Sequence, residues 1–148
     1  MAYPTREGTA SALFTLVSTA VGAKTSSRVL RQPADVSPAE CPAIFQTQKP
    51  EQDVRQSGII GIPNKRIMRF ELWLITSDAQ EPTIVPSTQL NTMVDAIEAA
   101  LAGLPTTGAQ TLGGVVASAR IEGQVEYFED WAGDGKSAAC VPVEVILP

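Results

Sequence analysis

The side chains best able to do chemistry in this chain are carboxylates that gather near its C-terminal end. They fall within a short stretch, at Glu122, Glu126, Glu129, Asp130 and Asp134. Hard divalent cations prefer oxygen ligands, so such a group could serve a metal-dependent nuclease. The same residues could equally form an acidic surface that faces solvent or another subunit. We favour the acidic surface.

The chain contains no histidine. This removes the commonest general base and the commonest metal ligand, and it excludes Ser-His-Asp and Cys-His arrangements. The phosphate-binding patterns GxxxxGK[ST] and GxGxxG are also missing, and the pair Gly113-Gly114 is typical of a turn. We therefore expect no enzyme, no metal site and no cofactor.

The two cysteines, Cys41 and Cys140, lie far apart in the sequence, and neither belongs to a CxxC motif. A zinc or redox motif is therefore not indicated. One distant pair is weak evidence for a secreted, disulfide-bonded protein. We expect two buried free thiols, with a disulfide as the alternative.

The charge is divided unevenly along the chain. The net charge is −5, but residues 1–74 carry nine Lys/Arg and six Asp/Glu, and residues 75–148 carry two and ten. A duplex DNA-binding protein would show a basic stripe, which this sequence lacks. The division fits a mixed solvated surface, or a subunit with one basic and one acidic side that packs head to tail.

Three of the carboxylates have the spacing of one strand face. On one straight strand Glu122, Glu126 and Asp130 would point the same way, and they would repel one another unless a cation approached. We hypothesise that a neighbouring subunit supplies that charge. The candidate cations fall in two groups, Lys65, Arg66 and Arg69, or Arg28 and Arg31.

Two tryptophans are further candidates for an interface. Trp131 stands among acidic and glycine residues in an expected turn, where an exposed aromatic ring suits a contact with a partner. Trp73 lies on the polar-bearing side of an expected strand, and it fits either the core or an interface.

Apolar periodicity predicts two helices, over residues 5–21 and 86–102. In the second helix, apolar residues recur at i, i+3, i+4, i+7 and i+11 from Leu90 to Leu101. Alternation predicts a strand over Lys65–Thr76, with Met68 and every second residue after it facing one way. Pro142 suggests an edge position or a bulge in the last strand. Strands are expected over residues 26–31, 43–48, 65–76, 115–122, 125–128 and 138–147.

The order of helix, strands, helix and strands predicts an α+β fold, with a mostly antiparallel mixed β-sheet and two helices packed on one face. A length of 148 residues suits a single domain over 1–148, with a long connector loop at about 49–63. The apolar stretches are shorter than the ~20 residues that span a bilayer, and no basic segment precedes an apolar leader. We expect a protein that is made and kept in the cytoplasm and does not associate with a membrane.

The chain resembles the tail-terminator family of long-tailed bacteriophages, which includes the minor tail protein U type. Four segments carry the resemblance in order: ALFTL at 12–16; ADVSP at 34–38 with CPAIFQ at 41–46; LNTMVDAIEAAL at 90–101; and TLGGVV at 111–116, IEG at 121–123 and VPVEVI at 141–146. Together they span most of the chain, and the connector at 49–63 is its most variable part.

The resemblance implies a structural virion protein in the neck region, made in the host cytoplasm. Family members form a six-fold ring that docks on the tail tube protein, ends tube growth and offers a surface to the head-tail connector or stopper protein. DNA passes through the ring without specific binding, and an acidic protein suits that passage. Two alternatives stay open: another neck component of the head-completion or stopper type, and a small metal-dependent enzyme that uses the 122–134 stretch.

Overall fold

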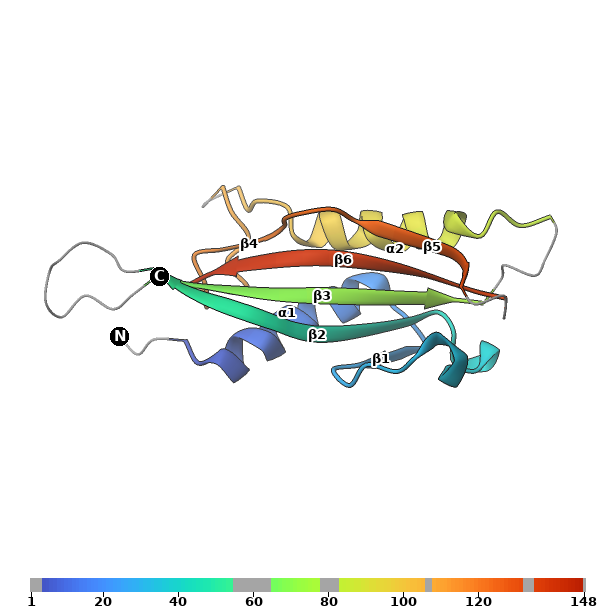
Figure 1. The fold of residues 1–148 in the computed structure, drawn as a ribbon. Helices are drawn as coiled ribbons and strands as arrows, with labels where there is room; N and C mark the ends of the chain where they lie inside the picture. Colours follow the sequence, from blue (N-terminus) through green and yellow to red (C-terminus); the bar gives the residue numbers. More distant parts are fainter. Residues whose placement is uncertain (1–3, 55–64, 78–82, 106–107, 132–134, 148) are drawn as a thin grey trace, which may run out of the picture.

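The computed structural model describes residues 4–54, 65–77, 83–105, 108–131 and 135–147, without the side chain of Trp131 (Figure 1). Its six-stranded sheet has the order β1-β2-β3-β6-β4, and β5 pairs with β6 beyond the end of β4. Neighbouring strands are antiparallel except β1 and β2. The strands are β1 (Thr25–Ser27), β2 (Ala43–Val54), β3 (Lys65–Thr76), β4 (Ser118–Ile121), β5 (Glu126–Trp131) and β6 (Lys136–Ile146).

Both helices lie behind the sheet, on one of its faces (Figure 1). Helix α1 spans Arg6–Val21, and α2 spans Ser87–Ala100. Thr5 caps α1 by accepting a hydrogen bond from the Gly8 amide at 2.9 Å, and Gly22 ends it at φ 63°, a conformation that glycine adopts without strain. The predicted α+β fold, with two helices on one face of a mostly antiparallel mixed sheet, is confirmed.

The main hydrophobic core fills the space between the helices and the sheet. Leu13 and Val17 from α1 meet Leu90 and Ile97 from α2, and all four side chains are fully buried. The alternation predicted for Lys65–Thr76 is confirmed, because every second side chain from Met68 on points into this core. The sheet contributes Ile44, Met68, Phe70, Leu72, Leu74, Ala139, Val141, Val143 and Val145.

A smaller cluster lies on the opposite face, beneath residues 28–42. We call this segment the strap; it contains two short 3-10 turns, Pro33–Asp35 and Pro38–Glu40. It covers Phe45, Ile75 and Ala138. The strand predicted over 26–31 is wrong beyond Ser27, where β1 ends, because the arginines that follow bond to carboxylates outside the sheet.

The connector predicted at 49–63 begins later than expected. Residues 49–54 continue β2 and pair with the start of β3, with Lys49 opposite Arg69 and Asp53 opposite Arg66. A bulge between Lys49 and Gln52 accommodates Pro50, which has no amide hydrogen for the ladder. The polar composition concealed this strand, because alternation of apolar and polar residues appears only where one face is buried. Residues 55–63 lie outside the described residues.

The C-terminal strands also differ from expectation. Residues 115–117 precede β4 in a turn, where the Thr111 carbonyl accepts the amides of Gly114, Val115 and Val116. Pro142 lies inside the sheet, between β3 and the β4/β5 side, and not at its edge. It is tolerated there because β4 ends and β5 begins opposite it; its carbonyl accepts the Glu122 amide at 3.1 Å. No helix in the described ranges is long and apolar enough to cross a membrane.

Candidate interface on the open face of the sheet

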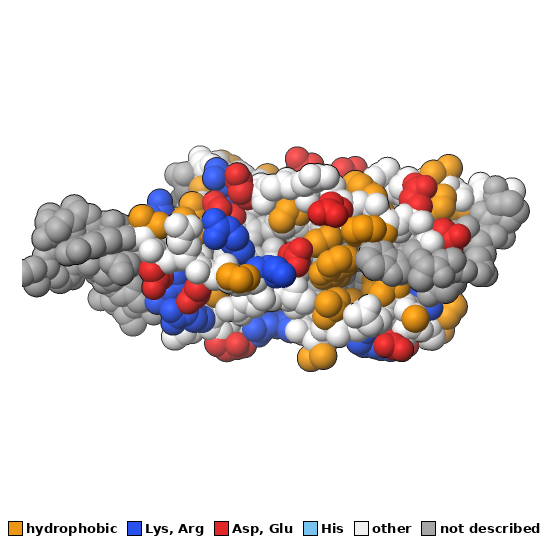
Figure 2. Space-filling view, in the orientation of Figure 1, with side chains coloured by type: hydrophobic (Ala, Val, Ile, Leu, Met, Phe, Trp, Pro, Cys, Tyr) orange, Lys and Arg blue, Asp and Glu red, His pale blue; other side chains and the backbone are white. Residues whose placement is uncertain are grey.

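The face of the sheet without helices, which we call the open face, is the candidate site. Figure 2 shows apolar side chains gathered on one half of it and charged side chains on the other. In the apolar half, Trp73 of β3 stacks on Phe128 of β5, with ring centroids 6.1 Å apart and planes 19° apart. Two strap residues are exposed, Leu30 at 43%, which lines a pocket with Trp73, and Val29 at 73%. Such a patch suits contact with another protein.

The charged half is a lattice of alternating signs built by the register of four strands. Arg69 of β3 lies opposite Glu144 of β6, which lies opposite Arg120 of β4. Glu144 is only 12% exposed and lies 3.7 Å from Arg69 and 3.4 Å from Arg120, and Arg120 also reaches Glu122 at 3.2 Å. These four charges, two of each sign, pair with one another, so the group that they form is neutral.

A thiol and a carboxylate join the two halves. Cys140 donates a hydrogen bond to Glu71 at 3.1 Å, and Glu71 also pairs with Lys49 at 3.3 Å. Burial first, and the bond to Glu71 second, raise the pKa of the Cys140 thiol to about 12. The thiol is therefore protonated at neutral pH and a poor nucleophile. Cys41 and Cys140 are both buried thiols outside any disulfide, as predicted.

The carboxylates predicted to share a face do not form one row. Glu122 follows β4 and bonds to Arg120 of the same subunit, whereas Glu126 lies on β5, opposite Cys140. A register shift separates Phe128 from Trp131, and Asp130 has φ 47° and accepts the Gly135 amide at 3.1 Å. The condition of one straight strand is not met, because β4 and β5 are two strands with a break around Gly123, as the separate strands predicted over 115–122 and 125–128 imply. Asp130 closes a turn.

Four of the five candidate cations pair within the subunit. Arg28 bonds to Glu7, Arg31 to Glu40, Arg66 to Asp53 and Arg69 to Glu144. Only Lys65 has no ion pair among the described residues. Much of the basic excess of the N-terminal half is thus neutralised locally. The role of these residues between subunits stays a prediction.

Sequence reasoning missed Lys49, Glu71, Arg120 and Glu144, which make up most of the charged lattice. Their alternation along β3 and β6 was the available signal, since Glu71 and Glu144 each stand between two core residues. Trp73 lies half-buried on the open face and packs against the smaller cluster, and its role at an interface stays a prediction. For Trp131 only the backbone is described, at the end of β5.

In the described part of the chain, no three Cys, Asp or Glu side chains lie close enough together to bind one metal ion. Within the acidic stretch, Glu122 pairs with Arg120 and Asp130 accepts a hydrogen bond from the Gly135 amide. Asp134 lies outside the described residues.

Glu40 should make stability depend on acid pH. The Arg31 guanidinium first, and the Ser37 amide and hydroxyl next, lower the pKa of Glu40 to about 2. A depressed folded-state pKa adds stability that is complete above the unfolded value near 4.5 and is lost as the pH falls toward 2. We expect Glu40→Gln to lower the urea midpoint at about pH 6, with the gap to the parent protein closing by about pH 2. As a control, Glu98→Gln, an exposed change on α2, should leave the urea midpoint equal to that of the parent protein at every pH. A difference in midpoint for Glu40→Gln that does not change with pH would contradict this assignment.

No protein-family model matches the chain, and no curated protein matches it. Solved structures do match. One chain, from the virion of a native gene transfer agent particle, is 15% identical with a TM-score of 0.49, over 92% of this chain and 91% of its own. Another, known only by a sequence identifier, is 10% identical with a TM-score of 0.51, over 97% of this chain and 93% of its own. The chain is therefore similar in fold to this second protein along nearly its whole length.

Proposed function

We propose that this chain is a non-enzymatic structural protein of a phage-type virion. Its copies form a ring, of six subunits as the family resemblance implies, that caps the tail tube, ends its growth and joins the tail to the head connector. The proposed partners are a second copy of the chain, the tail tube protein and the connector or stopper protein. The proposed location is the neck of the virion, after synthesis in the host cytoplasm.

The observation that carries this proposal is where the family-like segments fall in the fold. ALFTL lies in α1, CPAIFQ runs into the start of β2, LNTMVDAIEAAL forms most of α2, and VPVEVI lies in β6. These elements surround the main core from both layers. The resemblance therefore includes both helices and the strands β2 and β6, and is not confined to one short motif.

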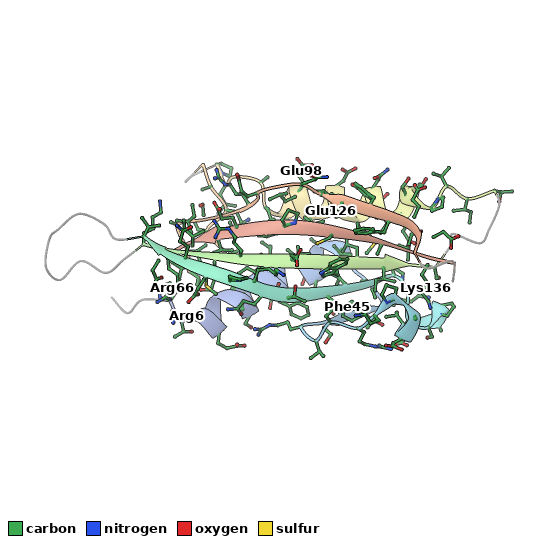
Figure 3. The ribbon with its side chains drawn as sticks, viewed as in Figure 1. Arg6, Phe45, Arg66, Glu98, Glu126 and Lys136 are labelled. Carbon is green, nitrogen blue, oxygen red and sulfur yellow. The ribbon has the colours of Figure 1, made fainter. Side chains whose placement is uncertain are left out.

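The distribution of charge supports a passage for DNA. Glu98 on α2 lies toward the upper edge of the molecule as drawn in Figure 3. Glu98 and Asp95, both on α2, are exposed and belong to no ion pair among the described residues. A side with unpaired carboxylates repels phosphates, so facing a lumen it would let DNA slide without being held.

The size of the subunit allows a ring. The chain exposes 7991 Å². Two ring contacts of ~800 Å² each would cover about a fifth of that surface. The remaining surface suffices for contacts with the tube on one side and the connector on the other.

Electron microscopy of particles from a phage that lacks this reading frame tests the proposal. We expect overlong tails beside filled, tailless heads, and normal particles when the gene is supplied from a plasmid. Tails of normal length that fail to join would assign the chain to the head-completion or stopper role instead. Intact, infectious particles would refute a structural role.

A further inference from the structure

The strap, residues 28–42, is held differently from the rest of the fold. Backbone hydrogen bonds of its inner residues are local: Asp35 to Gln32, Val36 to Pro33, Glu40 to Ser37 and Cys41 to Pro38. Within the part of the chain that the structure describes, no backbone–backbone hydrogen bond ties positions 28–40 to a strand of the sheet; the Val29 amide donates to the Ser27 hydroxyl at the end of β1 at 3.0 Å. Positions 28–40 can therefore leave the sheet without breaking the β-ladder, while the Pro42 carbonyl at the end of the strap stays bonded to the amides of Lys24 and Thr25.

The strap also keeps its own shape. Arg31 bonds to both carboxylate oxygens of Glu40, at 2.6 and 3.1 Å, and to the Asp35 carbonyl. Glu40 in turn accepts the Ser37 amide at 3.2 Å and the Ser37 hydroxyl at 3.1 Å. These bonds join the two ends of the segment to its middle. Compact loops of this kind, whose ends lie close together, behave as units.

The strap contacts the body mainly through a few apolar side chains. Pro33, Val36 and Cys41 are its buried side chains, and Arg28 bonds to Glu7 of α1. A cavity of about 100 Å³ remains between its first half and β3, beside Trp73 and Ile75. Few buried apolar contacts and incomplete packing are the features of a segment that opens locally.

We propose that the strap is a removable cover that opens as one unit while the rest of the fold stays intact. Opening uncovers Phe45, Ile75 and Ala138, which then extend the apolar half of the open face beyond the stacked Trp73 and Phe128. The closed strap keeps this apolar strip from water in the free subunit. This inference does not depend on ring formation.

Two native thiols report on the opening. Cys41 stands at the end of the strap, and Cys140 stands in β6, paired with strands on both sides. Labelling of a buried thiol by N-ethylmaleimide follows the population of the opened state when closing is fast. Mass spectrometry of the two peptides gives both rates in one sample. We expect Cys41 to react faster than Cys140, and with a weaker dependence on low urea concentrations.

Two matched valine variants decide whether the opening is local. Val145→Ala, in the main core, lowers only the free energy of global unfolding. It should therefore raise the labelling rate of Cys140 roughly tenfold and leave the labelling rate of Cys41 unchanged. Val36→Ala removes a contact that is lost in both reactions, so it should accelerate both cysteines by the same factor. If Val145→Ala accelerated both cysteines equally, the strap would open only with the whole molecule and the inference would be wrong. An unchanged Cys41 rate in Val36→Ala would also overturn it. Should either variant fail to fold, equal urea dependence of the two rates in the parent protein would refute it.

Discussion

Replacing Phe70 with alanine should lower the free energy of unfolding by about 3–5 kcal/mol. Phe70 lies in β3, near the middle of the sheet, and only 1% of its side chain is exposed. It packs on the side where both helices meet the sheet. Removing the ring leaves a cavity that the rigid sheet and the two helices cannot fill. The lost free energy of burying the ring and the cost of the cavity therefore both lower the stability. Urea denaturation with linear extrapolation measures the change.

The matched control is the same substitution on the other face. Phe128 of β5 is half-buried and stacks on Trp73, so Phe128→Ala should cost about 1–2 kcal/mol, mostly from apolar contact and the lost stacking. Equal costs at the two positions would mean that the open face is as tightly packed as the helix-covered face. That result would contradict the placement of the main core on one side of the sheet.

Replacing Glu126 with lysine should abolish assembly of the ring and leave the monomer folded. Glu126 is exposed on β5 and makes no ion pair among the described residues, so its charge contributes little to the fold. At a contact between subunits, two like charges brought together cost several kcal/mol, which is enough to prevent association. Light scattering after gel filtration measures the mass, and thermal unfolding checks the fold. Asp130, the other carboxylate expected at this contact, is unsuitable for the same test because it closes a turn.

Two control variants test this prediction, one that removes the charge of Glu126 and one that also reverses its expected partner. Glu126→Gln removes the charge without reversing it and should only weaken assembly. Lys65 is the candidate cation without an ion pair among the described residues, so Lys65→Glu combined with Glu126→Lys should restore the ring if these two residues meet between subunits. Rings that form normally with Glu126→Lys would remove this edge from the interface, without deciding whether the chain forms a ring.

The layers of the fold were predictable because they depend on short-range patterns. The alternation in Lys65–Thr76 and the helical spacing from Leu90 to Leu101 each arise from one buried face, and both elements lie where the patterns place them. Thr5 and Gly22 mark the ends of α1 through bonds to residues three or four positions away. The lack of histidine needs no fold to interpret, because composition alone excludes the commonest catalytic arrangements.

The candidate site was much less predictable, because its residues meet across strands that are distant in sequence. The pairing of Arg69 and Arg120 with Glu144 depends on the register of β3, β4 and β6, which no local pattern specifies. The strap over Phe45 likewise follows from how β1 joins β2 in parallel.

The sequence by itself thus determined the two layers, both helices, the strand Lys65–Thr76 and the expected lack of catalytic groups, since these depend on composition and on neighbours within one or two turns. Only the tertiary structure decided that the arginines are neutralised within the subunit, that Glu122, Glu126 and Asp130 separate, and that Pro142 lies inside the sheet. The physical reason is the same in each case. Which charges pair, and where a strand lacks a hydrogen-bonding partner, depend on which strands lie side by side. The packing of the whole core determines that arrangement, and no single segment does.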